Sequence, residues 1–225
     1  MRASGSPRPS AAVEDYAKAI YALEGRGHGA VTTNALAERL GVTPGSASAM
    51  VRRMAQSGLV THEPYRGVVL TDAGRDVALE VLRHHRLLEL FLTELGVPWD
   101  SVHDEAEVLE HHLSEELEAL IAARLGDPTH DPHGDPIPTA DLRIDEGRTV
   151  ALDGLAVGAR GVFVRVSDSN PELLRFLGER RIAPGDALEI VERRAPGDPV
   201  VIRVPSGTHA LDGEVARAMR VELGP

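Results

Sequence analysis

The sequence predicts a mainly α-helical protein with a smaller β component. It reads as a winged helix-turn-helix, then a helical middle, then a small antiparallel β-barrel at the C-terminus. Three observations support this fold class. Apolar residues recur at helical spacing through most of residues 11–125. Two of these helices are joined by a tight turn and followed by two short apolar segments. After a proline-rich stretch, short Val/Leu/Ile segments alternate with Gly and Pro.

The N-terminal segment predicts three helices. The first covers residues 13–24, where one face carries Val13, Ala17, Ile20 and Leu23. The second covers 32–40, with capping chemistry at Thr33-Asn34 and Gly41 at its end. The third covers 43–57, with Thr43 as its N-cap. Pro44 takes the first helical position, where a missing N–H costs nothing, and Gly58 is the candidate C-cap.

Strands at 59–63 and 67–71 flank the turn Pro64-Tyr65-Arg66 and form the wing. Long helices are predicted at 72–95 and 98–125. The second of these carries an apolar stripe suited to a homodimer interface: Val102, Leu109, Leu113, Leu117 and Leu120.

Residues 126–139 contain four prolines and predict a stiff, non-helical linker. Beyond it, strands at 161–166, 187–193 and 200–204, interrupted by a helix at 171–180, predict the small barrel. The expected division is a disordered tail at 1–10, a DNA-binding domain at 11–74, a helical domain at 75–140 and the barrel at 141–225.

Composition narrows the class of protein. No run of about 18 apolar residues occurs and the N-terminus lacks a signal sequence, so we expect a cytosolic protein with no membrane span. The chain has no cysteine, which excludes disulfides and thiolate metal sites. The net charge of −11 is unevenly divided, because residues 1–75 carry +3 and residues 76–225 carry −14. A basic N-terminal module joined to an acidic remainder is consistent with nucleic-acid binding at one end.

The segment 36–48 has the form of a support helix, a tight turn at Gly41 and the start of a recognition helix. Hydroxyl groups and free backbone N–H groups at the start of a helix suit phosphate oxygens. Arginines on this helix and side chains at the wing tip add further contacts. The candidate DNA-binding residues are Thr43, Pro44, Ser46, Ser48, Arg52, Arg53, Tyr65 and Arg66. The alternative is a winged helix used for protein contacts.

Acids and histidines recur at helical spacing in the two long helices. His85 and Glu89 are one turn apart, and a second set of ligand-capable residues shares one face: His103, Glu107, Glu110 and His111. If the helices pack against each other these side chains converge, and Asp15 on the first helix can join them. Carboxylates and imidazoles without sulfur suit Mn²⁺, Fe²⁺ or Zn²⁺. The alternative is a solvated polar helix face.

Nearly the whole chain resembles the diphtheria toxin repressor family of metal-dependent regulators. The resemblance is carried by 84–89, 96–99 and 103–114, by the first helix from Glu14 to Tyr21, and by Pro136-Ile137-Pro138 before the barrel. It implies that the barrel is Src-homology-3-like. It also implies a primary metal site at Asp15, Glu107, Glu110 and His111.

In iron-type members the first two of these positions are usually Met and Cys. The carboxylates found here resemble the manganese-type members, and hard oxygen ligands tolerate Mn²⁺. For a second site, the resemblance implies His85, Glu89 and His103, with His133 of the linker and Asp168 of the barrel as further candidates. The alternative for His133 and Asp168, which the sequence favours equally, is that they are an ordinary loop imidazole and an ordinary turn acid. Small manganese regulators without a barrel share a Glu where this chain has Lys18.

The predicted function is therefore a non-enzymatic, manganese-responsive repressor that binds double-stranded operator DNA as a homodimer. Divalent metal would activate it to shut down metal-uptake genes. An iron-dependent repressor of the same family is the nearest alternative. Two alternatives come from other classes: a carboxylate–histidine metalloenzyme, and a winged-helix regulator that responds to an organic ligand.

Overall fold

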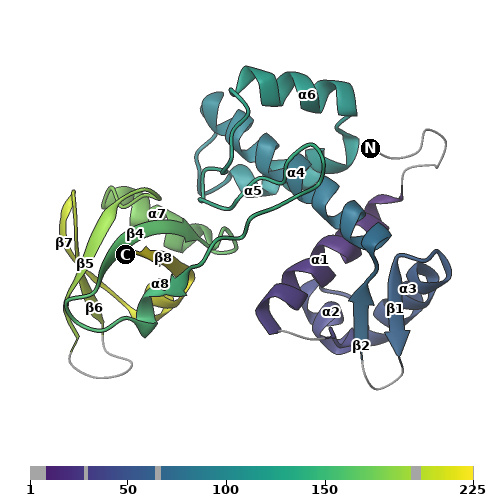
Figure 1. Ribbon diagram of the computed structural model, residues 1–225, viewed down its shortest axis with the longest axis horizontal. Helices are drawn as coiled ribbons and strands as arrows, with labels where there is room; N and C mark the ends of the chain where they lie inside the picture. Colours follow the sequence, from purple (N-terminus) through teal and green to yellow (C-terminus); the bar gives the residue numbers. More distant parts are fainter. Residues whose placement is uncertain (1–8, 28–29, 64–66, 194–198, 225) are drawn as a thin grey trace. The chain divides into compact units, whose positions relative to one another are not determined.

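The computed structural model describes residues 9–27, 30–63, 67–193 and 199–224. The chain divides into two compact units, which are described separately. The first comprises Met1–His85, Glu110–Leu113 and Pro138–Ile144, and the second comprises Arg86–Leu109, Ser114–Ile137 and Asp145–Pro225. The prediction of a mainly helical protein with a smaller β component is confirmed. Figure 1 shows the order of the elements along the chain.

The first unit begins with three helices: α1 (Ala11–Gly27), α2 (Thr33–Arg39) and α3 (Pro44–Gln56). The predicted cap of α3 is confirmed, because the Thr43 side chain accepts the Ser46 N–H and Pro44 occupies the first turn. The expected cap of α2 at Thr33-Asn34 is wrong by one residue. Thr32 has the extended backbone of an N-cap and accepts the Ala35 N–H, so its hydroxyl satisfies the free donor.

The wing is an antiparallel hairpin of β1 (Val60–Glu63) and β2 (Gly67–Leu70). The Val31 N–H and C=O pair with Val68, which ties the α1–α2 connection to the second strand. Buried side chains from α1, α2, α3 and the hairpin form one apolar core, including Ile20, Leu36 and Met54. This core fixes α3 on the first unit with its N-terminal turn exposed. The predicted wing tip, Tyr65 and Arg66, lies outside the described residues.

Helix α4 (Asp72–Glu94) has the predicted bounds to within one residue. The single helix predicted at 98–125 is wrong. The structure has α5 (Val102–Leu109), a 3₁₀ turn η1 (Glu110–His112) and α6 (Glu115–Arg124) instead. Ser114 is extended and its side chain accepts the Leu117 N–H, so a new helix starts there rather than continuing the old one.

This break also divides the predicted apolar stripe. Val102 and Leu113 are buried within the chain, whereas Leu109, Leu117 and Leu120 are 39%, 49% and 62% exposed. The interface therefore cannot be one face of a single continuous helix.

The proline-rich segment 126–139 is non-helical, as predicted, and it packs against the protein. The backbone carbonyl of His133 accepts a hydrogen bond from the Val166 N–H at 3.0 Å, so the segment lies along β4 (Arg160–Val166). Gly134 has φ +86°, and a Cβ there would lie 1.9 Å from the Val164 carbonyl oxygen. Only a glycine permits this close approach. The segment is thereby held where His133 is buried.

The second unit contains an antiparallel six-stranded sheet in the order β3-β8-β4-β5-β6-β7. The predicted strands are confirmed as β4, β5 (Ala187–Glu192) and β6 (Val200–Val204), and the predicted helix as α7 (Pro171–Glu179). The sequence analysis missed several short elements. These are β3 (Val150–Ala151), η2 (Leu152–Gly154), β7 (Gly207–Leu211), α8 (Gly213–Ala218) and β8 (Met219–Leu223).

A core that includes Phe163, Leu174, Ile190 and Ile202 lies between the sheet and its helices. Figure 1 shows α7 and α8 beside the strands of this sheet. Across the described residues, none of the helices combines the length and apolar character needed to cross a bilayer.

Candidate metal centre

Three predicted ligands meet in the first unit, and we call them the first cluster: Asp15, Glu110 and His111. Asp15 comes from α1, and the other two come from the 3₁₀ turn η1. Their ligand atoms lie within 4.8 Å of one another. His111 Nε2 is 2.9 Å from Asp15 Oδ1 and 3.5 Å from Glu110 Oε1. The break in the predicted long helix is thus what brings η1 to α1.

Glu14 orients His111, and the sequence analysis missed it. The buried Glu14 carboxylate lies 2.7 Å from His111 Nδ1. A carboxylate accepts the Nδ1–H, which leaves Nε2 with a lone pair facing Asp15 and Glu110. Its position beside Asp15, among apolar neighbours of α1, was the only signal for this role in the sequence.

Glu110 is the buried anion of the first cluster. Its side chain is fully buried, and both oxygens are engaged within the first unit. Lys18 Nζ lies 2.5 Å from Oε1, and His85 Nδ1 lies 2.5 Å from Oε2. Burial alone would raise the pKa of Glu110, but the His85 hydrogen bond and the Lys18 charge outweigh it and lower that pKa. Glu110 is therefore held ionised, as a metal ligand must be.

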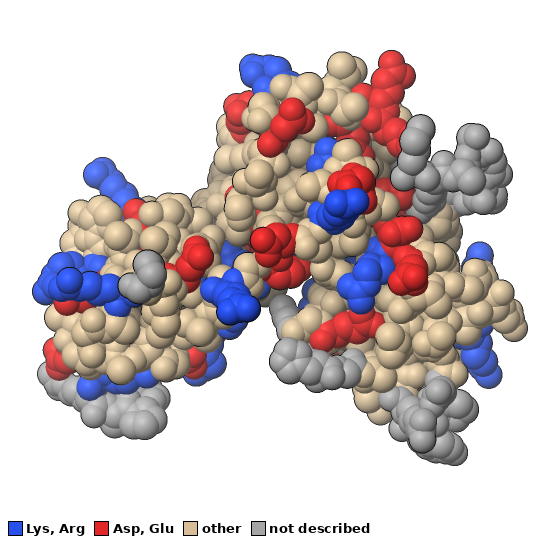
Figure 2. Space-filling view, in the orientation of Figure 1, with Lys and Arg blue, Asp and Glu red and all other residues tan. Residues whose placement is uncertain are grey.

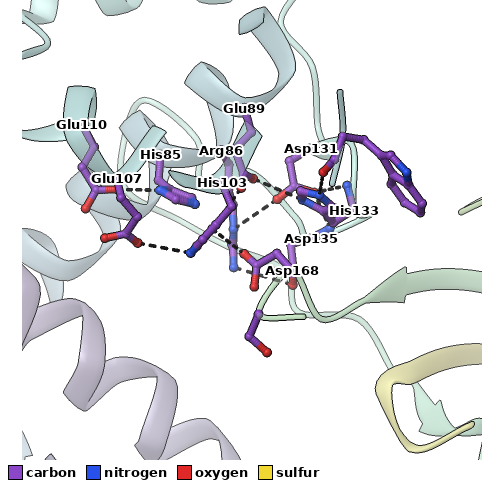
Figure 3. A network of polar contacts seen from close by, with 12 residues as sticks. His85, Arg86, Glu89, His103, Glu107, Glu110, Asp131, His133, Asp135 and Asp168 are labelled. Atoms are coloured by element: carbon purple, nitrogen blue, oxygen red, sulfur yellow. Dashed lines mark hydrogen bonds and ion pairs between the residues drawn. The ribbon is translucent and has the colours of Figure 1, made fainter. Parts of the chain in front are cut away.

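A second cluster lies in the second unit and consists of Glu89, His103 and Asp168 (Figure 3). Glu89 comes from α4, His103 from α5 and Asp168 from the loop after β4. His103 Nδ1 is 3.1 Å from Asp168 Oδ2 and 3.3 Å from Glu89 Oε1. Burial would lower the pKa of His103, but the Asp168 and Glu89 carboxylates raise it to about 10.

Two further predicted ligands, Glu107 and His85, lie on helices α5 and α4. Glu107 is on α5, and its Oε1 lies 3.7 Å from His103 Nε2, with the side chain 40% exposed. His85 lies one helical turn before Glu89 on α4, and in the first unit its Nδ1 contacts Glu110. Figure 3 shows these side chains on α4 and α5.

His133 of the linker lies on the other oxygen of Glu89. His133 Nδ1 is 3.5 Å from Glu89 Oε2, and its Nε2 donates to the Trp99 carbonyl at 2.7 Å. The Glu89 carboxylate, although opposed by burial, raises the pKa of His133 to about 9. Asp131, which the sequence analysis missed, joins Glu89 and His133 in a fully buried group of potential ligands. Its proximity depends on the fold of the linker, so local sequence gave no signal for it.

The predicted DNA-binding residues on α3 form an exposed set. Thr43, Pro44, Ser46, Arg52 and Arg53 are exposed, and Ser48 is half-buried. The hydroxyls of Thr43 and Ser46 lie 2.9 Å apart at the first turn. The helix therefore presents hydroxyl groups at its N-terminus and two guanidinium groups further along, an arrangement suited to phosphate oxygens.

Comparison with known proteins identifies the family. Residues 10–68 match the model of the iron dependent repressor N-terminal DNA binding domain, and residues 71–139 match that of the iron dependent repressor metal binding and dimerisation domain. The diphtheria toxin repressor of Corynebacterium glutamicum is 32% identical over 220 residues, covering 93% of this chain and 95% of that protein. The chain belongs to the diphtheria toxin repressor family.

Other comparisons agree with this family assignment. The iron-dependent repressor IdeR of Mycobacterium tuberculosis is 33% identical over 223 residues, covering 93% of this chain and 96% of that protein. A solved structure described as a manganese-dependent transcriptional repressor in complex with manganese superposes with a TM-score of 0.88. It is 41% identical and covers 94% of this chain and all of that one.

Residues 150–223 match the FeoA domain, a Src-homology-3-like β domain, so the predicted fold class is confirmed. This member of the diphtheria toxin repressor family is a metal-dependent DNA-binding repressor.

The side chains of both clusters fit a divalent cation. Each offers carboxylate oxygens and an imidazole nitrogen within 4.8 Å, and the sequence contains no cysteine. Such oxygen and nitrogen sets suit first-row divalent ions rather than soft thiolate-preferring ones. Residues 76–125 carry twelve acids against three arginines, and Figure 2 shows acidic side chains gathered on the helical part of the chain. Bound cations would relieve the repulsion among these carboxylates.

Proposed function

We propose that this repressor is activated by Mn²⁺ and binds operator DNA as a homodimer. The observation that carries the proposal is the composition of the first cluster: two carboxylates and one imidazole, with a third carboxylate, Glu14, behind the imidazole. Hard oxygen ligands tolerate the weakly bound, oxygen-preferring Mn²⁺. The relative solved with manganese supports the same ion.

The first cluster connects the DNA-binding helices to the metal site. Asp15 lies on α1, which packs in the same core as α2 and α3. Glu110 and His111 lie on η1. In the metal-free protein Lys18 pairs with Glu110, while Asp15 and Glu14 add two more negative charges to the same cluster. A divalent ion supplies the positive charge that allows these groups to stay together, which fixes α1 against η1. The ion can shift the equilibrium only as far as its affinity differs between the two arrangements.

Operator binding is assigned to α3 and the wing. The proposed contacts are Thr43, Pro44, Ser46, Ser48, Arg52 and Arg53, together with Tyr65 and Arg66 beyond the described residues. The proposed domains are 11–74 for DNA binding, 75–140 for dimerisation and metal binding, and 141–225 for the barrel. The exposed Leu109, Leu117 and Leu120 supply the apolar surface proposed for the homodimer. Two DNA-binding parts at fixed spacing then match two half-sites.

The second cluster is proposed as an ancillary metal site that ties the barrel to the helices. His103 on α5 and Asp168 of the barrel share it with Glu89 on α4. His85 is proposed as a further ligand of this site by resemblance, and His133 by its approach to Glu89. The assignment of Glu107 to the primary metal site stays a prediction from the resemblance.

Iron remains the competing activator, because the relative from Mycobacterium tuberculosis is named iron-dependent. The test is operator binding with Mn²⁺, Fe²⁺, Zn²⁺ and no metal, using duplexes selected from a random pool by the Mn²⁺-loaded protein. Binding that needs a divalent ion, and responds to Mn²⁺ at physiological concentration, supports the proposal. Equal binding in chelator contradicts it, and a response to Fe²⁺ alone replaces manganese with iron. Equilibrium dialysis measures whether Mn²⁺ binds stoichiometrically. Stoichiometric binding without catalytic turnover of any substrate supports a sensor rather than a metalloenzyme.

A further inference from the structure

Lys18 is the only lysine in the sequence, and the other 23 basic side chains are arginines. It lies on α1, one turn after Asp15, and its side chain is only 15% exposed. Its ammonium lies 2.5 Å from Glu110 Oε1. The same oxygen is 3.5 Å from His111 Nε2, so it faces the first cluster. The ammonium therefore sits on the Glu110 oxygen that faces the other candidate ligands.

The two cationic side chains differ in ways that matter at this position. An ammonium is a compact point charge on a flexible stem, whereas a guanidinium is a broad planar fork. Glu110 Oε2 is already 2.5 Å from His85 Nδ1, and the carboxylate is fully buried. A compact cation can neutralise the remaining oxygen and can also swing away along its stem. A chain that uses arginine everywhere else has lysine at the position where these properties are needed.

We propose that Lys18 is an internal competitor of the activating metal ion. It neutralises Glu110 in the metal-free protein and leaves Oε1 when a divalent ion is bound by the first cluster. Lys18 thereby sets the metal concentration at which the repressor becomes active. This inference rests on the proposed function, because it assigns a role to Lys18 at the same site.

The size of the effect follows from competition. If Glu110 Oε1 is released from Lys18 in about one molecule in ten, the apparent metal affinity is about tenfold lower than the intrinsic affinity. The cost is the same for every divalent ion, because it belongs to the metal-free protein. Lys18 therefore shifts the threshold without changing the ranking of metals. This separates its role from that of the ligands themselves.

The first test compares Lys18→Met with Arg75→Met. Both remove one positive charge from the first unit, but Arg75 pairs with Glu24, 3.3 Å away and outside the cluster. We expect Lys18→Met to bind Mn²⁺ and Zn²⁺ about tenfold more tightly than wild type, while Arg75→Met is unchanged. Operator binding should shift to correspondingly lower Mn²⁺. Wild type that binds no divalent ion contradicts the proposed function itself. Wild type that binds, with Lys18→Met equal or weaker, overturns only the role of Lys18.

The second test uses the wild-type chain and so does not depend on the folding of a variant. Selective ¹³C labelling of the lysine Cε carbon gives a single resonance, since Lys18 is the only lysine. Titration with the diamagnetic ion Zn²⁺ should move the Cε resonance to the position of a solvated lysine. The change should be complete when the first cluster is saturated with Zn²⁺. A resonance that keeps its metal-free position at saturation overturns the proposal.

Discussion

Asp168 Oδ2 of the barrel lies 3.1 Å from His103 Nδ1 of α5, and both side chains are about 30% exposed. The pair joins two segments 65 residues apart in the sequence, and Glu89 of α4 completes the group at 3.3 Å from the same nitrogen. Three elements of the second unit thus converge on one imidazole. An ancillary metal at this position would hold the barrel through a single carboxylate.

Replacing Asp168 should therefore weaken the second metal site. We expect Asp168→Asn to reduce affinity for the second Mn²⁺ by about tenfold or more, because an anionic ligand becomes a neutral one. Binding at the first cluster should be unchanged. Isothermal titration calorimetry measures both events. Glu179→Gln, an exposed acid of the same barrel, is the matched control. Equal affinities in Asp168→Asn and the control would remove Asp168 from the site.

Metal binding at the second cluster should release protons. The pKa of His103 is raised to about 10 in the metal-free protein, mainly by Asp168 and Glu89 acting against burial. The imidazole is therefore protonated at neutral pH and must lose its proton to become a ligand. Affinity should rise with pH up to about 10, by about tenfold per unit if His103 alone limits it. Calorimetry in buffers of different ionisation enthalpy measures the released proton. Asp168→Asn should reduce that release, and a pH-independent affinity would contradict the assignment.

Two arginines of α3 should contribute to DNA binding but not to metal binding. Arg52 and Arg53 are exposed on the helix that begins at Pro44. Arg52→Ala and Arg53→Ala should each weaken operator binding and reduce the salt-dependence slope by about one unit, the signature of one lost phosphate contact. Titrations at two salt concentrations measure this. Arg124→Ala, at the end of α6, serves as the control. Slopes unchanged from wild type would remove this helix from the DNA surface.

Dimerisation should survive removal of metal, because apolar burial rather than a cation is proposed to drive it. Leu117 and Leu120 on α6 are 49% and 62% exposed in the isolated chain. We expect sedimentation to give a dimer in chelator and a monomer for Leu120→Arg, since a buried unpaired charge is costly. Monomeric wild type in chelator, or dimeric Leu120→Arg, would contradict the proposed interface.

Metal selectivity should depend on Asp15 and Glu107. Asp15→Met with Glu107→Cys replaces two hard carboxylates by softer sulfur groups, which favours metals later in the Irving–Williams order. Mn²⁺ affinity should fall more than affinity for Fe²⁺, Co²⁺ or Zn²⁺. Metal-dependent operator binding across these ions measures the ranking. If the double variant keeps the wild-type ranking, these two residues do not set selectivity.

Local chemistry explains which parts of the fold could be predicted. Thr43 and Pro44 define the start of α3 through contacts within one turn, and α4 follows from its apolar periodicity. The break at Ser114 was missed because apolar spacing continues across it. The helix breaks there because the Ser114 hydroxyl caps a new helix and because Glu110 is buried against Lys18 and His85.

The same distinction applies to the clusters. Helical spacing predicts Glu89, His103, Glu110 and His111 as ligands, and the resemblance adds Asp168 and His133. Glu14 and Asp131 were missed, since their roles arise from contacts with His111 and from the fold of the linker. Tertiary packing brings such residues to the site, and neither the charge pattern nor the residue spacing of the sequence predicts that packing.

The central claim is that a divalent ion in the first cluster turns on DNA binding. It is tested most directly by measuring the affinity of wild type and His111→Ala for a selected operator as Mn²⁺ is titrated, with circular dichroism confirming that both are folded. We predict that wild type gains at least about tenfold in operator affinity on adding Mn²⁺, a coupling typical of two linked sites. His111→Ala should lose this gain while keeping its weak metal-free binding. An equal response of His111→Ala to Mn²⁺, or a wild type indifferent to Mn²⁺, would contradict the account.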